Sequence, residues 1–206
     1  MLKTTAAAWT HGSPVDQNHV EQLVVVANTH LHWDPKYPDV KTIQSMMLTR
    51  EIVSMVESVR SSFSERTLQF SDIKVLLCGD FNSLMDSGVF QFLSTGQLPL
   101  SHSEFQGFDY INAIVTMMSG ECCSKITHPL KLSSACSPQI MPCTNYTYEF
   151  KAMIDYMFYS SSNMVCLGVY GSILQEWFDI FSVVGCPHPL VPSDHFPVIA
   201  AFQMTA

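Results

Sequence analysis

The stretch Gly79-Asp80-Phe81-Asn82 follows the apolar run Ile73–Cys78, and this junction decides how the rest of the chain is interpreted. The run is typical of a buried strand, and the glycine with two polar residues opens a loop at its carboxyl end. A second apolar run, Leu23–Asn28, leads in the same way into Thr29-His30-Leu31-His32-Trp33-Asp34. Two buried strands that end in polar side chains predict a layered sheet with a functional site at the strand carboxyl ends.

Helices are fewer than strands in the remaining sequence. Apolar residues at helical spacing predict a helix within Val40–Val59, with a core-facing stripe at Val40, Ile43, Met46, Met47, Val53 and Val56. A short helix is expected over Ser87–Leu93, closed by Gly96. Further strands are expected over Met153–Tyr159, Met164–Tyr170 and Phe196–Met204. The fold class is therefore α/β or α+β, while the weakly patterned region between Pro99 and Phe150 predicts only short strands.

The composition excludes several classes of protein. Of 206 residues, 47% are apolar and 14% charged, which excludes a disordered tail and a coiled coil and favours one domain. A net charge of −8 has the wrong sign for a broad basic face that binds nucleic acid. No apolar run approaches the ~20 residues of a membrane span, so we expect no membrane association. The seven cysteines form no CxxC pair, and we interpret them as reduced thiols of an intracellular protein.

Two further polar clusters, Ile154-Asp155-Tyr156 and Ser193-Asp194-His195-Phe196, lie at the start of predicted strands. A single aspartate beside a strand is usually a turn or a helix cap, and a lone histidine is usually structural. Four such clusters in a chain with so few charges favour a hydrolytic site. Carboxylate and amide oxygens are the ligands that Mg²⁺ prefers, and histidines add proton transfer or charge stabilisation.

Two other classes of hydrolase fit the sequence less well. The stretch Thr29–Asp34 approaches the HxHxDH signature of zinc hydrolases of the metallo-β-lactamase type, in which His30 and His32 would share one face of a strand. Pro35 replaces the last histidine of that signature and cannot ligate through its side chain. A Ser-His-Asp triad is excluded for Ser193–His195, because adjacent residues cannot converge on one point.

The ordered motifs NTHL, GDFN, IDY and SDHFP resemble the exonuclease–endonuclease–phosphatase superfamily, whose fold is an αββα sandwich of two sheets. Longer stretches resemble the catalytic deadenylases of the carbon-catabolite-repressor/Not complex: VVVANTHLHWDPKYPDVKTIQSMM, VLLCGDFNSLMDSGVFQFLSTG, MPCTNYTYEFKAMIDYMFYS and GCPHPLVPSDHFPV. The likeness runs from about Leu23 to Phe202. It implies that residues 23–206 form the carboxyl-terminal part of a nuclease/phosphatase-type catalytic domain, incomplete at its N-terminus, after an atypical segment at 1–22.

The resemblance implies a role for each matching residue in phosphodiester hydrolysis. Asp80 would orient or deprotonate the attacking water, and Asn82 would hold the nucleophile or the phosphate. His195 would donate to the phosphoryl oxygens, while Asp155 holds its imidazole and raises its pKa. His30 would make a second phosphate contact.

Metal, substrate and partners follow from the same resemblance. Asp194 would face a metal, and two Mg²⁺ ions are expected. Asn145, Phe150 and Pro35 would line an adenine pocket, in which the Phe150 ring stacks on the base. The substrate would be poly(A) RNA, shortened from its 3′ end with release of 5′-AMP. Partners would be the scaffold and companion subunits of the complex, in the cytoplasm with the nucleus as an additional compartment.

One feature of the family pattern is not matched in this sequence. The family has an Asn on its first strand and a metal-binding Glu in a QE-type motif before NTHL, and the residues upstream of Leu23 contain no such motif. We therefore expect the principal metal carboxylate to be missing from this chain. Two alternatives stay open: a catalytically inactive, truncated binding module, and a phosphatase or phosphodiesterase of the same superfamily that acts on a nucleotide or a phospholipid.

Overall fold

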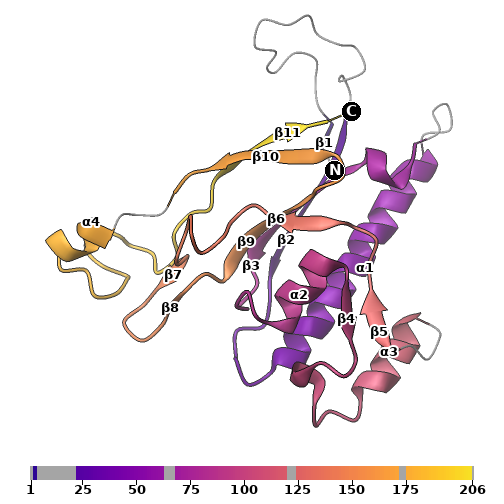
Figure 1. The fold of residues 1–206 in the computed structure, drawn as a ribbon, viewed down its shortest axis with the longest axis horizontal. Coiled ribbons are helices and arrows are strands. Elements are labelled where there is room, and N and C mark those ends of the chain that lie inside the picture. Colours follow the sequence, from indigo (N-terminus) through magenta and orange to yellow (C-terminus); the bar gives the residue numbers. More distant parts are fainter. Residues whose placement is uncertain (1, 4–21, 63–67, 120–123, 172–174, 206) are drawn as a thin grey trace, which may run out of the picture.

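A computed structural model describes residues 2–3, 22–62, 68–119, 124–171 and 175–205 of the chain (Figure 1). They form a main sheet of five strands, helices on one face of this sheet, and a second, smaller sheet on its other face. No helix in these ranges is long and apolar enough to cross a membrane.

The main sheet has both predicted buried strands near its centre. Its strand order is β1 (Leu2–Lys3), β2 (Leu23–His30), β3 (Lys74–Asp80), β9 (Asp155–Ser160) and β6 (Leu132–Ser134). β2 runs parallel to β3, whereas β9 runs antiparallel to it. The carboxyl ends of β2 and β3 therefore meet the amino end of β9 at one edge, and the polar clusters of all three strands lie there.

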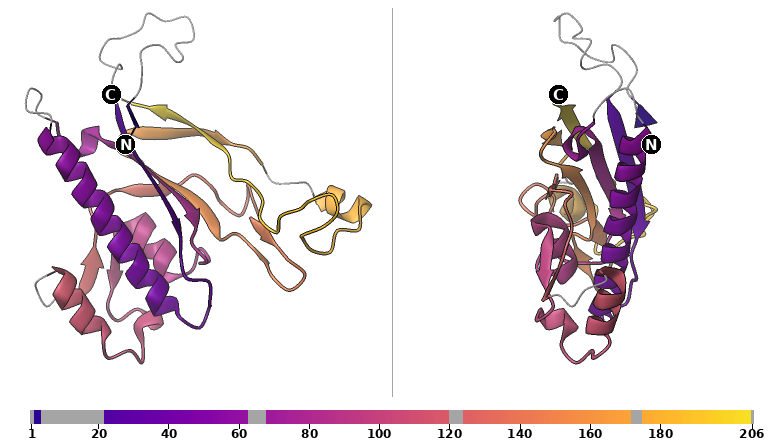
Figure 2. Two further views of the ribbon diagram at one scale, coloured as in Figure 1. Left: turned by 180° about the vertical axis from the view of Figure 1, so that it is seen from behind. Right: turned by 90° about the vertical axis from the view of Figure 1, so that its right-hand side faces the viewer.

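The second sheet packs against the main sheet face to face. β10 (Met164–Val169) pairs antiparallel with β11 (Ala200–Met204). The ring of Tyr159 in β9 lies 5.1 Å from the ring of Phe202 in β11. The neighbouring Phe158 is fully buried on the opposite face, because successive side chains of a strand alternate. The two further views in Figure 2 show the same layers, and the predicted two-sheet class is confirmed.

Two helices, α1 (Pro38–Ser62) and α2 (Gly88–Thr95), cover the face of the main sheet opposite to the second sheet (Figure 1). α2 has the predicted flanking residues Ser87 and Gly96, but its last residue is Thr95, two residues beyond the predicted Leu93. The hydroxyl of Ser87 accepts a hydrogen bond from the N–H of Phe90, and Gly96 ends the helix with a φ of 74°.

The buried face of α1 is more polar than the apolar stripe predicted for it. Met46 and Val56 are buried as expected, but Met47 is 56% exposed. The face that points inward includes three hydroxyl residues, Thr42, Ser45 and Thr49. Each hydroxyl donates to a carbonyl three or four residues earlier in the same helix, so it brings no unpaired donor into the core. This internal pairing explains why hydrophobic spacing alone misplaced part of the stripe.

The region between Pro99 and Phe150 contains a helix that the sequence did not predict, α3 (Ile111–Ser119). The buried residues Ile111 and Val115 are one turn apart, but a nine-residue apolar segment is too short for periodicity to separate helix from strand. The remaining short elements are β4 (Gln97–Pro99) paired with β5 (Lys125–Thr127), β7 (Asn145–Tyr146) paired with β8 (Lys151–Ala152), and the 3₁₀ turns Phe70–Asp72 and Ser103–Phe105.

A small apolar cluster joins the β7–β8 hairpin to the chain that follows β10. The ring of Tyr146 stacks on Phe178 of α4 (Gln175–Ile180), with centroids 4.4 Å apart, and Phe196 packs against both rings. The cluster fixes the segment before β11 against β7 and so positions the loop that contains His195.

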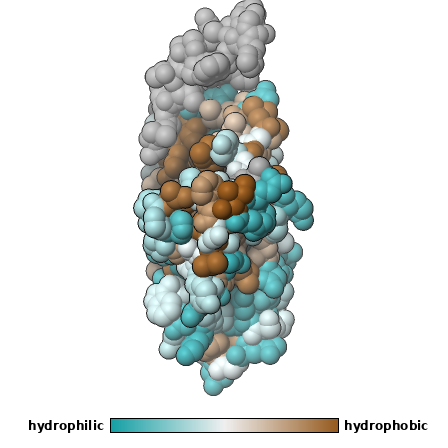
Figure 3. Space-filling model, turned by 90° about the vertical axis from the view of Figure 1, so that its left-hand side faces the viewer, coloured by the Kyte–Doolittle hydropathy of each residue, from teal (hydrophilic) through white to brown (hydrophobic). Residues whose placement is uncertain are grey.

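Several apolar side chains are exposed on the surface of the described residues. Figure 3, which views the molecule from the side where α4 lies in Figure 1, shows apolar patches among polar residues. Val165 and Leu167 of β10 are exposed, as are Ile180 and Leu190 beside the small cluster. The second sheet therefore buries its inner face and leaves apolar side chains of β10 in water.

The described cysteines fit the interpretation as reduced thiols. Cys78, Cys136, Cys143, Cys166 and Cys186 are all free. Burial raises the pKa of Cys136 to about 11, so this thiol stays protonated near neutral pH. Cys122 and Cys123 lie outside the described residues.

Gly79 is required at the edge where the polar clusters meet. Its φ is 147°, and an added Cβ would lie 1.9 Å from the carbonyl oxygen of Thr29 on β2. We expect Gly79→Ala to lower the free energy of unfolding by at least ~3 kcal/mol, because β2 and β3 would have to separate. Urea unfolding followed by circular dichroism measures the change. Gly168→Ala is the matched control, since an added Cβ there has no neighbour within 4 Å. Equal losses in the two variants would contradict this explanation.

Candidate active site

One rung of the main sheet places three predicted site residues side by side. The register of β2 aligns His30 with Asp80, and the register of β9 aligns Asp155 with the same residue. Residues paired across neighbouring strands point to the same face of a sheet. Tyr159 lies four residues after Asp155 on β9, so this face is the one that packs against the second sheet.

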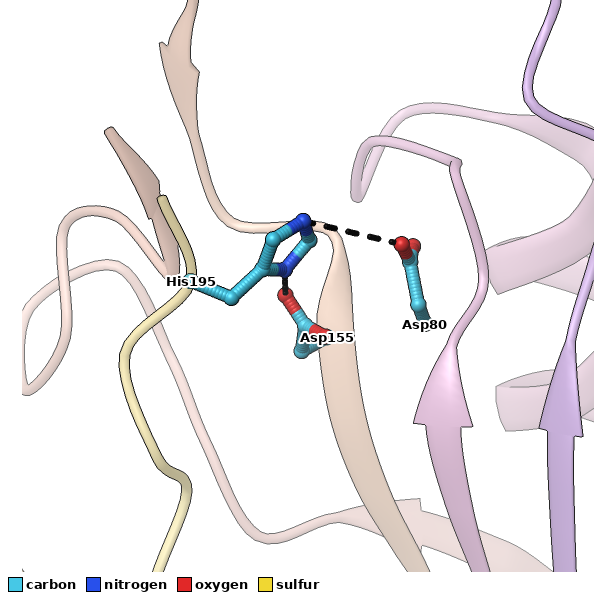
Figure 4. Close-up of side chains that lie close together, drawn as sticks. All are labelled: Asp80, Asp155 and His195. Carbon is cyan, nitrogen blue, oxygen red and sulfur yellow. Dashed lines mark hydrogen bonds and ion pairs between the residues drawn. The ribbon is translucent and has the colours of Figure 1, made fainter. Parts of the chain in front are cut away.

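His195 reaches this rung from the loop before β11. A backbone bridge to Asn145 fixes its position, and its ring points toward both aspartates (Figure 4). Its Nδ1 lies 2.9 Å from Asp155 Oδ2, and its Nε2 lies 3.9 Å from Asp80 Oδ2. An ionised carboxylate can only accept, so Nδ1–H donates to Asp155. The contact between Asp155 and His195 that the resemblance implied is therefore present, and it directs Nε2 toward Asp80.

The surroundings of His195 favour its charged form. Partial burial lowers the pKa of the imidazole, but the hydrogen bond and charge of Asp155, with the charges of Asp80 and Asp194, outweigh burial and raise it. A protonated His195 would present an N–H donor with positive charge at Nε2. Such a donor suits the oxygens of a phosphate group.

Asp80 is a more basic carboxylate than an ordinary aspartate. Burial raises its pKa, and the charge of Asp155 adds to this rise. The N–H of Asn82, which donates to Asp80 Oδ1 at 2.8 Å, and the nearby histidines act in the opposite direction. His30 Nε2 lies 3.4 Å from Asp80 Oδ2, and the side chain of His30 is 71% exposed. The second oxygen of Asp80 thus faces two imidazoles and can take part in proton transfer.

Asn82 lies in a tight turn that contacts two other parts of the fold. Its φ is 46°, and its Nδ2 donates to the carbonyl of Leu31 at 2.9 Å. The ammonium group of Lys41, a buried residue of α1, donates to the carbonyl of Asn82 at 2.8 Å. Burial lowers the pKa of Lys41, and nearby carboxylates, Glu104 foremost, oppose this. Sequence reasoning missed Lys41, because a lysine in a helical pattern is normally a solvated side chain.

Asp80, Asp155 and, in its neutral form, His195 could together hold a cation. Each offers one ligand atom, and these atoms all lie within 4.8 Å of one another. Within the described ranges no other three such side chains come as close. Two carboxylates suit a hard divalent cation, and positive charge would offset the unfavourable burial of Asp80. Asp194 lies outside this group, with its Oδ2 3.4 Å from Asn145 Nδ2, so its role as a metal ligand stays a prediction.

The surroundings of His30 and His32 do not support the zinc site of the alternative interpretation. β2 ends at His30, and beyond it the ring of His32 lies 6.2 Å from the ring of Trp33 and 5.6 Å from that of Tyr37. His30 faces Asp80 instead, and neither histidine belongs to a cluster of candidate ligands in the part of the chain that the structure describes.

The residues predicted to bind adenine lie on two separate segments. Asn145 is buried on β7 and adjoins the rung through its bridge to His195. Phe150 is 43% exposed in the β7–β8 turn, where its N–H donates to Thr147 Oγ1. Pro35 is exposed in the loop after β2. Among the described contacts none joins Pro35 to Phe150, so a pocket formed by all three stays a prediction.

Two groups of curated proteins are similar in sequence to this chain. It is 42% identical over 189 residues to "CCR4-NOT transcription complex subunit 6-like" of Danio rerio, covering 89% of this chain and 34% of that protein. It is 34% identical over 193 residues to "CCR4-Not complex 3′-5′-exoribonuclease subunit Ccr4" of Schizosaccharomyces pombe, covering 88% of this chain and 26% of that protein. The chain thus spans about a third or less of the length of these relatives. No protein-family model matches it.

A solved structure supports the fold. ANGEL2, described as a 2′,3′-cyclic phosphatase, superposes with a TM-score of 0.63 at 27% identity, covering 89% of this chain and 57% of that chain. The expected two-sheet sandwich of the exonuclease–endonuclease–phosphatase type is therefore confirmed.

Asp155→Asn should lower the pKa of His195, because the negative charge that favours the imidazolium is removed while burial stays. NMR titration of the His195 ring protons measures this value. Asp179→Asn, at an exposed carboxylate on α4, should leave it unchanged. An unaltered His195 pKa in Asp155→Asn would refute the electrostatic role given to Asp155.

The same shift makes stability depend on pH. The pKa of His195 is higher in the folded than in the unfolded chain, so its stabilisation is complete below the unfolded value of ~6.5. It is lost as the pH rises through the folded value. We therefore expect the free energy of unfolding of the wild-type chain to fall across this window more steeply than that of Asp155→Asn, as measured by urea titrations at several pH values.

Proposed function

Because this chain is homologous over most of its length to the CCR4-NOT subunit 6-like proteins and to the Ccr4 exoribonuclease subunits, we propose that it carries part of the catalytic domain of an mRNA deadenylase. The reaction would be 3′-to-5′ exonucleolytic hydrolysis of poly(A) with release of 5′-AMP. The observation that carries the proposal is the group of Asp80, Asp155 and His195, whose ligand and donor atoms converge at one edge of the main sheet.

In this reaction Asp80 acts on water. Its carboxylate, made more basic by burial, accepts a proton from a water molecule whose oxygen attacks the terminal phosphodiester. The bond between phosphorus and the 3′ oxygen of the preceding nucleotide breaks. 5′-AMP leaves, and the shortened strand keeps a 3′ hydroxyl after its oxygen takes a proton from solvent.

The imidazoles and the turn after β3 hold the phosphate. His195, whose pKa is raised by Asp155, donates in its protonated form from Nε2 to a non-bridging oxygen as negative charge develops there. His30, exposed on the other side of Asp80, makes a second phosphate contact, and Asn82 holds the nucleophile or the phosphate. Mg²⁺ ions, bound through carboxylates of this edge with Asp194 among them, would add positive charge that the acidic chain otherwise lacks.

Specificity for adenine is proposed to come from stacking and amide contacts. Phe150 offers a partly exposed ring, and a base stacked on such a ring gains ~1–3 kcal/mol. Asn145 supplies an amide that can donate and accept, and Pro35 supplies a rigid apolar wall. The partners would be poly(A) RNA and companion subunits of a CCR4-NOT complex, in the cytoplasm and the nucleus.

A phosphatase of the same superfamily is the second candidate, favoured by the likeness to ANGEL2. The products separate the two functions, since a deadenylase releases 5′-AMP from oligo(A) and a phosphatase leaves the chain length unchanged. A catalytically inactive binding module would instead bind RNA or a partner in the presence of EDTA and release no product.

In a complete catalytic domain that contains this chain, Asp80→Asn should lower the rate of 5′-AMP release from oligo(A) at least ~100-fold, because the amide cannot accept the proton of the attacking water. Product release is followed by chromatography in the presence of Mg²⁺. Asp86→Asn, at an exposed carboxylate six residues further along, should retain activity. Undiminished hydrolysis by Asp80→Asn would contradict the mechanism.

Phe150→Ala should reduce the preference for oligo(A) over oligo(U) about tenfold, since one base–aromatic stack is lost. The comparison uses kcat/KM for the two substrates. Tyr148→Ala is the matched control, because Tyr148 is even more exposed on the same hairpin. If both variants keep the wild-type preference, Phe150 does not bind the base.

A further inference from the structure

Thr144 lies where the segment that carries Asp155 meets the loop that carries His195. It is fully buried, one residue before β7. Its N–H donates to the carbonyl of Ala152 at 3.0 Å, and its carbonyl accepts the N–H of Phe196 at 2.7 Å. The backbone of this single residue is therefore bonded both to β8 and to the neighbour of His195.

The side chain of Thr144 extends these links to β9. Its Oγ1 accepts two hydrogen bonds, from the N–H groups of Ile154 and Asp155, each at 3.0 Å. Asp155 is the first residue of β9, and its pair with Asp80 is the last rung of the β3–β9 ladder. At this end of the strand the threonine hydroxyl takes the place of a strand partner for two consecutive N–H groups.

We propose that Thr144 is a positioning residue of the candidate active site: its hydroxyl and its carbonyl together set the separation of Asp155 and His195 and so their 2.9 Å hydrogen bond. Thr144 acts through these two residues and need not touch substrate. Its effect on the ring of His195 stands on the contacts alone, whereas its effect on turnover rests on the proposed function.

The choice of threonine follows from the space and the donors around it. Valine has nearly the same shape but no acceptor, so Thr144→Val would leave the N–H groups of Ile154 and Asp155 without a partner in a buried place. Serine keeps the oxygen and loses only a methyl group. The pair of variants Thr144→Val and Thr144→Ser therefore separates the hydroxyl from the packing.

The matched control is Ser160→Ala, at the opposite end of β9. Ser160 is also buried, and its Oγ also accepts a backbone N–H, that of Val75, at 3.0 Å. Both substitutions remove a buried hydroxyl that accepts a main-chain donor from this sheet. Of these two residues, only Thr144 is hydrogen-bonded to Asp155 itself and to the neighbour of His195.

The experiment is proton NMR of the 206-residue chain with ¹⁵N-labelled histidine, which detects the Nδ1 proton of His195 that is donated to Asp155. We expect exchange of this proton with water to accelerate at least tenfold in Thr144→Val. It should stay near the wild-type rate in Thr144→Ser and in Ser160→Ala. Wild-type exchange in Thr144→Val, or equal acceleration in Ser160→Ala, would overturn the proposal, because a merely structural role would affect both ends of β9 alike.

Two further measurements keep the proposal open to refutation. If Thr144→Val does not fold, hydrogen exchange of the backbone amides of Ile154 and Asp155 in the wild-type chain tests the proposal instead. These amides should exchange as slowly as the amides of the β3–β9 ladder, and fast exchange would refute the proposed hydrogen bonds.

Where the wild-type chain hydrolyses oligo(A), kcat of Thr144→Val should fall at least tenfold with KM little changed, and Thr144→Ser should restore kcat. A complete catalytic domain that contains this chain, releases no 5′-AMP and still shows the slow His195 proton would refute the proposed function and leave the positioning role standing.

Discussion

The close approach of β2 and β3 at Gly79 is the constraint on which the rest of the site depends. Only a residue without a Cβ fits at position 79 of β3, because the carbonyl of Thr29 on β2 occupies the space that a Cβ would need. The parallel register of the two strands then places His30 beside Asp80. The antiparallel strand β9 adds Asp155 to the same rung. Three side chains from distant parts of the sequence become neighbours because their strands are adjacent at fixed register, not because any loop folds over them.

The pKa values of Asp80 and His195 at this edge are both raised, for different reasons. Burial disfavours the ionisation of Asp80, and the charge of Asp155 on the same rung adds to this rise of its pKa. The same two aspartates favour a protonated His195. The edge therefore combines a carboxylate that accepts a proton more readily than usual with an imidazole that holds its proton more strongly than usual. A site of this kind suits hydrolysis of a phosphate ester, in which a proton is removed from water while negative charge grows on phosphoryl oxygens.

Buried polar side chains connect the layers of this fold to the site. The hydroxyls on the inner face of α1 are paired within their own helix, so they allow that helix to pack closely without a continuous apolar stripe. Lys41 bonds α1 to the turn at Asn82, and Thr144 bonds β7 to the start of β9. Lys41 and Thr144 both bond to main-chain groups of segments that are distant from them in the sequence. Their pairing is what keeps a buried polar group from weakening the fold.

The local sequence was enough to determine the two central strands, the short helix between Ser87 and Gly96, and the polar residues that end each strand. The apolar runs and capping residues that indicate these elements lie within a few positions of one another. The family resemblance also implied a contact between Asp155 and His195, and the structure contains it. Tertiary structure alone decided the parts that depend on distant partners. The inward face of α1, the helix α3, and the contacts of Lys41 and Thr144 all require knowledge of which backbone group lies opposite. Hydrophobic periodicity records whether a side chain is buried, but not whether a polar one finds a donor or an acceptor there.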